Sequence, residues 1–224
     1  MQAAREWLDA LLAVTFAPLC AACDAPLRAP TRGCVCGDCW EGITPDVPPA
    51  HDILAAFGGV VRSGASAGVY EGSLRAIIQA LKYDGRRSLA RPLGQRMRAA
   101  SHPLLVGASA VVPVPLHRSR RRERGFNQAA DLAAHLGPPV VHALARARRT
   151  QPQAGLTADE RRANVAGSFV GTRAAAELGG AAVVLVDDVW TTGATLGTCA
   201  RVLLEAGARE VRVVTAARVA PSSR

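Results

Sequence analysis

The sequence predicts an α/β fold, in which an open, mainly parallel sheet is flanked by helices and preceded by a small cysteine-containing segment. Residues 183–186 are four consecutive aliphatic side chains followed by two acids, a pattern typical of a parallel strand buried on both faces. Other short aliphatic runs, at residues 110–115, 139–141 and 211–216, are separated by helical patterns, as in α/β sheets. The chain has 224 residues, of which 49% are hydrophobic, which is enough for one domain and a small appendage.

Composition points to an anionic ligand. The formal net charge is +9, and 26 of the 27 basic residues are arginine, which suits bidentate contacts with phosphate. We therefore expect a phosphate ligand or a nucleic acid, with a solvated basic surface as the alternative. No run reaches 18 apolar residues, so we expect no targeting segment, no membrane insertion and a cytoplasmic location.

The first predicted element is an amphipathic helix. Residues 3–16 have apolar side chains at helical spacing, and Pro18 ends the pattern. We expect the apolar stripe to pack on the rest of the protein rather than on a membrane, because the other face is as acidic as it is basic. A Pro-rich stretch at residues 44–49 separates an N-terminal region, residues 1–45, from a main domain at residues 46–224.

Four cysteines form two Cys-x-x-Cys pairs, Cys20 with Cys23 and Cys36 with Cys39, and twelve residues lie between the pairs. Two such pairs are typical of a structural zinc ion with four thiolate ligands. A single pair would be enough for thiol redox chemistry, which is the rival interpretation. Cys34 could replace Cys36 as the third ligand, and the sequence leaves that choice open.

Two predicted helices precede the α/β core. Before them, residues 57–70 look like a strand interrupted by glycines. The polar turn between the helices contains Lys82, the only lysine of the chain. This side chain is either a solvated helix end or a phosphate contact. We expect residues 46–105 to supply any hood over a ligand, and residues 106–220 to form the core.

The stretch after the buried strand carries the strongest functional signal. Asp187 and Asp188 follow the strand directly, and a Thr-rich loop then leads into an apolar helix. Ligands of open α/β sheets bind at the carboxyl ends of strands, where the next helix presents free N–H groups. The loop favours a phosphate, and the acids favour sugar hydroxyls or a shared metal ion. A ribose 5-phosphate meets both requirements; the alternative is a ligand-free turn before a capped helix. The loop residues are Thr191, Thr192, Gly193, Ala194 and Thr195.

This stretch resembles the phosphoribosyl-pyrophosphate (PRPP) binding motif of type I phosphoribosyltransferases. The resemblance implies that Asp187 and Asp188 hold the ribose 2′- and 3′-hydroxyls, and that residues 191–195 surround the 5′-phosphate. It also implies Mg²⁺, which enters with PRPP. The sequence has no P-loop and no Gly-x-Gly-x-x-Gly fingerprint, which argues against other nucleotide folds.

A basic segment follows the strand at residues 110–115. Residues 117–124 contain five arginines and a histidine, which repel one another unless an anion lies among them. An exposed basic turn is the alternative. The resemblance to type I transferases implies a pyrophosphate loop at this point, made of His117, Arg118 and Ser119.

A long polar excursion separates the strand at residues 139–141 from the strand at residues 168–170. Long loops in compact domains are usually functional. The resemblance implies a flexible loop that closes over PRPP and excludes water. Its candidate contact residues are Arg148, Thr150, Gln153, Arg161 and Asn164. Of these, we take Arg148 as a candidate catalytic residue together with the two aspartates.

Taken in order, these motifs resemble the ComF family of competence-associated, phosphoribosyltransferase-like proteins. Beside the cysteine pairs and the PRPP motif, they include Leu-Lys-Tyr-x-Gly at residue 81, Pro-Val-Pro-Leu-His-Arg at residue 113 and Arg-Gly-Phe-Asn-Gln at residue 124. The resemblance implies a zinc ribbon joined to a type I core, and a link to DNA uptake. The expected reaction transfers a phosphoribosyl group to an unknown acceptor, as in nucleoside metabolism. The alternatives are a protein that handles single-stranded DNA and a PRPP sensor without turnover.

Overall fold

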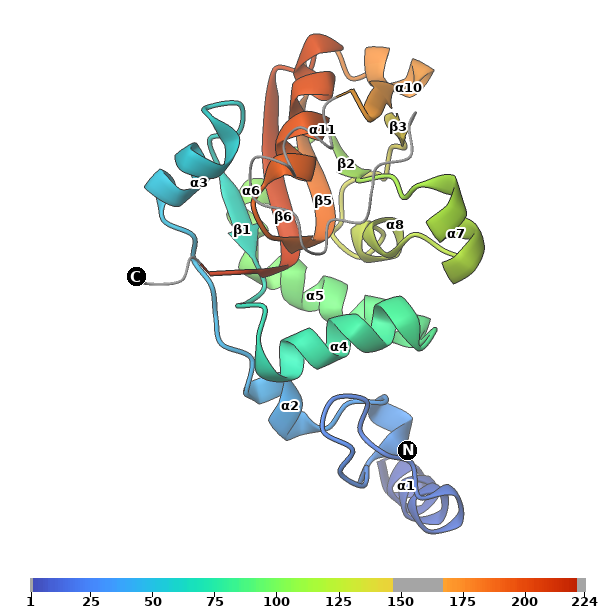
Figure 1. The fold of residues 1–224 in the computed structure, drawn as a ribbon. Helices are drawn as coiled ribbons and strands as arrows, with labels where there is room; N and C mark the ends of the chain where they lie inside the picture. Colours follow the sequence, from blue (N-terminus) through green and yellow to red (C-terminus); the bar gives the residue numbers. More distant parts are fainter. Residues whose placement is uncertain (1, 147–166, 221–224) are drawn as a thin grey trace.

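The computed structural model describes residues 2–146 and 167–220. Within these residues, four strands form one parallel sheet in the order β1-β6-β5-β2 (Figure 1). The strands are β1 (Gly64–Ser66), β2 (Ala110–Pro113), β5 (Ala182–Trp190) and β6 (Glu210–Arg218). A separate antiparallel pair consists of β3 (Leu144–Arg146) and β4 (Phe169–Gly171). The predicted open, mainly parallel sheet is therefore confirmed.

Helices cover both faces of this sheet, as the α/β prediction requires. On one face lie α4 (Gly72–Tyr83), α5 (Ala90–Ala100) and α8 (Gln128–Ala133). On the other lie α3 (Ala50–Phe57) and α11 (Ala194–Glu205). Shorter helices connect these elements: η1 (Pro30–Arg32), α2 (Gly37–Glu41), η2 (Arg87–Leu89), α6 (His102–Leu105), α7 (Arg118–Arg124) and α10 (Arg173–Ala176).

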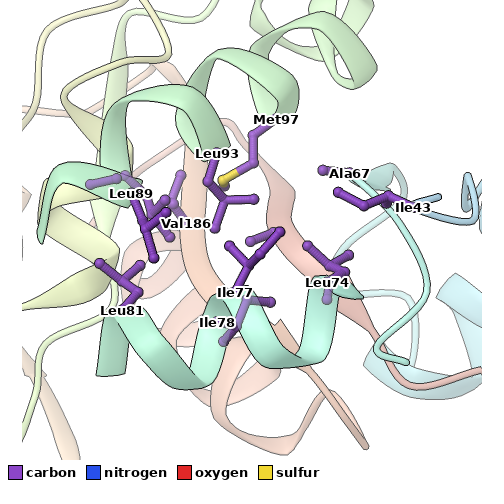
Figure 2. Packing of buried hydrophobic residues seen from close by; sticks show 14 of the residues in the cluster. Ile43, Ala67, Leu74, Ile77, Ile78, Leu81, Leu89, Leu93, Met97 and Val186 are labelled. Atoms are coloured by element: carbon purple, nitrogen blue, oxygen red, sulfur yellow. The ribbon is translucent and has the colours of Figure 1, made fainter. Parts of the chain in front are cut away.

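The central strand β5 contributes to the hydrophobic core on both of its faces. Successive side chains of a strand point to opposite sides of the sheet. Val184 and Val186 therefore join the core cluster of α4, α5 and α8, which Figure 2 shows, whereas Leu185 joins the cluster of α3 and α11. By the same alternation, Asp187 and Asp188 leave the strand on opposite faces.

The N-terminal helix α1 (Gln2–Phe16) forms where it is predicted, but the expectation that its apolar stripe packs on the protein is wrong. Trp7 and Leu11 are exposed. The helix instead turns a polar side to the cysteine segment, where the carboxylate of Asp9 accepts a hydrogen bond of 2.8 Å from the backbone N–H of Thr31. The segment that faces the helix thus offers polar partners rather than an apolar surface.

The region expected to form a hood also supplies part of the sheet. The glycine-interrupted segment at residues 57–70 contains one short strand, β1, which pairs with β6 at the edge of the sheet. Residues 46–105 additionally provide α3, α4 and α5. Whether they act as a hood, and whether a domain boundary lies at residue 45, stays a prediction. No helix of the described ranges combines the length and apolarity needed to cross a membrane.

Candidate functional site

A cavity of about 220 Å³ opens at the carboxyl ends of β2 and β5. The last backbone hydrogen bond from the β2 chain to β5 runs from Val114 N–H to the carbonyl of Val186, at 2.9 Å. Strand β5 then continues along β6 as far as Trp190. The separation of neighbouring chains at this edge creates the crevice in which ligands of open α/β sheets bind.

The Thr-rich loop lines this cavity in front of α11. Gly193 caps the helix with a φ of 78°, a left-handed conformation that favours glycine. A Cβ atom on Gly193 would lie 3.0 Å from the ring of Phe57 and 3.1 Å from the carbonyl oxygen of Ala56, so α3 packs directly against the loop. The N–H of Ala194 donates to Thr192 Oγ1 at 3.5 Å. All five predicted residues line the cavity: Thr191, Thr192, Gly193, Ala194 and Thr195.

Asp188 forms an ion pair with Lys82 at the wall of the cavity. The distance from Lys82 Nζ to Asp188 Oδ1 is 2.7 Å, and each side chain is only 14% exposed. Burial lowers the pKa of Lys82, but the neighbouring Asp188 carboxylate more than offsets this effect, and the pKa is raised. Of the two interpretations of Lys82, the solvated helix end is therefore wrong, because the folded chain buries it against an acid.

Asp187 lies on the opposite face of β5 and has a different environment. Burial raises the pKa of its carboxyl group to about 7, and the negative charge of Asp188 acts in the same direction. A hydrogen bond of 2.8 Å from the N–H of Asp188 to Asp187 Oδ1 opposes this shift, as do the charges of Lys82 and Arg146. The pair thus combines one carboxylate compensated by a lysine with one that is partly protonated at neutral pH.

Three arginines complete the charged lining of the cavity within the described chain. Arg120 and Arg124 come from α7, where their spacing of four residues places them on one face of the helix. Arg146 comes from the end of β3, and burial lowers its pKa, as does the nearby charge of Arg120. The guanidinium of Arg124 also lies 4.8 Å from the ring centre of Tyr83. Despite its two aspartates, the cavity is therefore suited to an anion.

The predicted pyrophosphate loop lies at the start of α7. Nδ1 of His117 accepts a hydrogen bond of 3.2 Å from the N–H of Ser119 and thereby caps this helix. Among the residues of this helix whose side chains are described, Arg120 and Arg124 line the cavity. Arg120 directly follows Ser119, and Arg124 lies one turn further along. A role of His117, Arg118 and Ser119 in binding pyrophosphate stays a prediction. The flexible-loop candidates lie outside the described residues: Arg148, Thr150, Gln153, Arg161 and Asn164.

Asn127 and Gln128 link α8 to the cavity. The side chain of Asn127 accepts from the N–H of Ala129 at 3.2 Å, which caps α8, and donates to the carbonyl of Val114 at 3.1 Å. Gln128 is fully buried, and within the described chain neither of its carboxamide atoms has a hydrogen-bond partner. Both residues line the cavity, whereas the sequence marks them only as part of the Arg-Gly-Phe-Asn-Gln motif and not as site residues.

The four predicted zinc ligands form one cluster. The sulfur atoms of Cys20, Cys23, Cys36 and Cys39 all lie within 4.8 Å of one another. The Cys20–Cys39 and Cys23–Cys36 distances are 3.9 and 3.8 Å. Four sulfurs at about 2.3 Å from a tetrahedral zinc ion are roughly 3.8 Å apart, so the arrangement fits the metal.

Hydrogen bonds within the cluster favour a thiolate at Cys20. Burial raises the pKa of this thiol, but hydrogen bonds that include those from the backbone N–H groups of Cys36 and Ala22 more than offset this effect. The resulting pKa is lowered to about 6. Cys34, the alternative ligand, lies apart from the four: its Sγ is 3.9 Å from Oγ of Ser88. The four clustered cysteines could therefore bind zinc, and the described geometry favours Cys36 over Cys34.

Comparison with known proteins decides the family. The chain is 31% identical over 212 residues to competence protein F of Haemophilus influenzae, which covers 90% of this chain and 85% of that protein. The chain belongs to the ComF family. A phosphoribosyl transferase domain model matches residues 122–223. Competence protein ComFC of Bacillus subtilis is 42% identical over 43% of this chain and 39% of its own length.

Other relatives of this chain carry a different name. DNA utilization protein YhgH of Salmonella typhi is 30% identical over 87% of this chain and 82% of its own length. Among solved structures, the allosteric regulatory enzyme of purine biosynthesis is 26% identical over 58% of this chain, with a TM-score of 0.39. The match spans 25% of that larger chain.

Proposed function

We propose that this ComF-family protein binds PRPP and transfers its phosphoribosyl group to an acceptor, with release of pyrophosphate. One observation carries the proposal: Asp187, Asp188 and the loop at residues 191–195 surround a single cavity at the carboxyl end of β5. The first turn of α11 offers backbone N–H groups to the 5′-phosphate. The two carboxylates offer oxygen acceptors to the ribose hydroxyls.

The arginines of the cavity suit the leaving group. In the proposed reaction, a nucleophilic atom of the acceptor bonds to C1 of the ribose while the bond from C1 to the pyrophosphate oxygen breaks. The electron pair of that bond leaves with pyrophosphate, and Arg120, Arg124 and Arg146 offset the resulting negative charge. Such a transition state needs no covalent nucleophile from the protein, so catalysis depends on positioning and charge.

The donor set also fits the magnesium ion that accompanies PRPP. Carboxylate and phosphate oxygens are the ligands that Mg²⁺ prefers in proteins. Asp187 and Asp188 would help to place the ion through water or the ribose oxygens. When it is bound, Mg²⁺ supplies further neutralisation of the pyrophosphate charge.

Calorimetric titration with PRPP in the presence of Mg²⁺ tests the binding site. The double variant Asp187→Ala, Asp188→Ala is expected to lose measurable binding, with its zinc content unchanged. A double variant with the same charge change, Glu177→Ala and Glu205→Ala, alters two exposed acids outside the cavity and should bind like the wild type. Retained affinity in the aspartate variant would contradict the assignment.

Two rival functions, the handling of single-stranded DNA and the sensing of PRPP without turnover, are tested together with the transferase reaction. The arginine-rich helix α7 and the names of the relatives favour a protein that handles single-stranded DNA during uptake or use. Phe126 is a poor stacking platform for bases, because it is only 7% exposed. DNA affinity that falls by orders of magnitude between about 50 and 200 mM salt would favour this function. Pyrophosphate release with one of a panel of nucleobases supports the transferase, whereas PRPP binding without release supports a sensor.

A further inference from the structure

The only lysine of the chain lies in the candidate site. The chain has 26 arginines, and the other basic residues that line the described cavity are arginines too. Lys82 contacts one oxygen of Asp188 at 2.7 Å. A lysine ammonium is a compact point charge, whereas the arginine guanidinium is a wide planar fork. The contact at position 82 therefore suits a small cation that meets a single carboxylate oxygen.

The hydrophobic core brings the two charged groups together. Leu81 of α4 and Val186 of β5 belong to the same buried cluster, and both are labelled in Figure 2. Lys82 is the next residue after Leu81, and Asp188 follows Val186 by two residues on the same face of the strand. Both side chains thus emerge where the core ends. The apolar packing of α4 on the sheet, rather than the ion pair, sets their separation.

Asp188 faces Lys82 more closely than it faces the other charges of the site. Among the described residues, Asp188 forms an ion pair with Lys82 and with no other side chain, and each partner is 14% exposed. Three arginines from two other elements line the same cavity: Arg146 of β3, and Arg120 and Arg124 of α7. Two further titratable groups lie nearby, Tyr70 close to Lys82 and Cys199 close to Asp187.

We propose that Lys82 is a positioning residue for PRPP: it binds one oxygen of Asp188, cancels the charge of that carboxylate and orients its other oxygen toward the ribose hydroxyls. A carboxylate has lone pairs for both contacts. Neutralisation by Lys82 also removes one repulsive charge from beside the phosphates. This inference rests on the proposed function, and it assigns Lys82 to the acid rather than to a phosphate group.

A double-mutant cycle tests whether Lys82 acts through Asp188. Lys82→Met should weaken PRPP binding by about 10- to 100-fold, the size of a lost charge-assisted hydrogen bond. Lys82→Arg keeps the charge and should recover part of that loss. In an Asp188→Asn background, Lys82→Met should change affinity by less than about threefold, because the interaction is already removed. Arg86→Met, a charge change on an exposed residue four positions away, should stay within about twofold.

Two results would overturn the proposal. One is an affinity for Lys82→Met that equals that of Arg86→Met. The other is an equal loss in both backgrounds, which would mean that Lys82 acts on the ligand without Asp188. If Lys82→Met does not fold, Lys82→Arg and Asp188→Asn still provide the comparison.

The ion pair is also tested without PRPP, so that failure of the positioning role of Lys82 can be distinguished from failure of the proposed function. Reductive ¹³C-methylation labels a single lysine in this chain, and its NMR signal reports on the surroundings of Lys82. The signal should shift in Asp188→Asn and remain unchanged in Asp84→Asn, which alters an exposed acid nearby. An unchanged signal in Asp188→Asn would overturn the positioning role. A shifted signal in a protein that does not bind PRPP would instead reject the proposed function.

Discussion

Replacement of each aspartate by asparagine is expected to change the stability of the protein in opposite directions. Asp187→Asn removes a carboxyl group whose pKa burial raises from an ordinary value of 3.8 to about 7. A group whose pKa is raised on folding contributes stability below its unfolded pKa, and this contribution is lost as the pH rises through the folded pKa. At pH 8 the wild type therefore carries a cost that the asparagine variant lacks.

The pKa shift sets the size of this effect. The rise from 3.8 to about 7 is roughly three pH units. Each unit corresponds to about 1.4 kcal/mol, so the full cost is about 4 kcal/mol. Asp187 is partly exposed in the cavity, and solvent screening lowers the estimate to about 2 kcal/mol. We expect Asp187→Asn to be about 2 to 4 kcal/mol more stable than the wild type at pH 8, and less than about half of that difference to remain at pH 5.

Asp188→Asn should have the opposite effect because it leaves Lys82 without its carboxylate. Both members of this pair are 14% exposed. Removal of one partner from a largely buried ion pair costs about 3 to 5 kcal/mol. The two substitutions have the same chemistry and lie on consecutive residues, so their opposite signs isolate the effect of environment.

Urea unfolding followed by circular dichroism between pH 5 and 8.5, at a fixed excess of zinc, measures these differences. The difference between Asp187→Asn and the wild type should grow as the pH rises to about 7 and then level off. Asp84→Asn, at an exposed site, should follow the wild type throughout. A difference that does not depend on pH, or an Asp187→Asn variant that is less stable at pH 8, would refute the reasoning.

Three further predictions concern other parts of the molecule. Gly193→Ala forces a residue with a Cβ into a φ of 78° against α3, and should lower stability by about 2 kcal/mol or more and weaken PRPP binding, as seen in melting and calorimetry. Cys36→Ser should lose bound zinc in elemental analysis, whereas Cys34→Ser should keep it, because Cys34 lies outside the cluster. Arg218→Met leaves the nearly buried Asp46 without its partner at 2.6 Å, and urea unfolding should show a loss of about 3 kcal/mol.

The fold was predictable where local patterns and burial agree. Residues 183–186 are apolar on both faces of their strand, so the sequence alone predicts a buried parallel strand, and β5 confirms it. The edge strand β1 has only three residues, including Gly64, and its pairing with β6 depends on distant parts of the chain. The orientation of α1 was mispredicted because its spacing reveals an amphipathic helix but not which face meets a partner.

The site was predictable only as far as it is contiguous in sequence. Asp187, Asp188 and the loop at residues 191–195 line the cavity as the motif suggests. Arg120 and Arg124 were included in the basic segment, and their helical spacing was a signal that could have singled them out. Arg146 had no such signal, because it reaches the cavity through the pairing of β3 with β4.

The pleat of β5 explains why Asp187 and Asp188, two adjacent residues of the same type, have different electrostatic environments. Consecutive side chains on a strand face different layers, so Asp188 meets α4 and its lysine, whereas Asp187 meets α11 and the end of β3. In a helix or a turn, two adjacent aspartates would have more similar surroundings, and the repulsion between their like charges would then raise both pKa values. On this strand, only one acid needs a counter-ion from the protein, and the other can exchange its proton near neutral pH. The division of labour therefore follows from strand geometry and from the core packing that places Lys82 at the tip of β5.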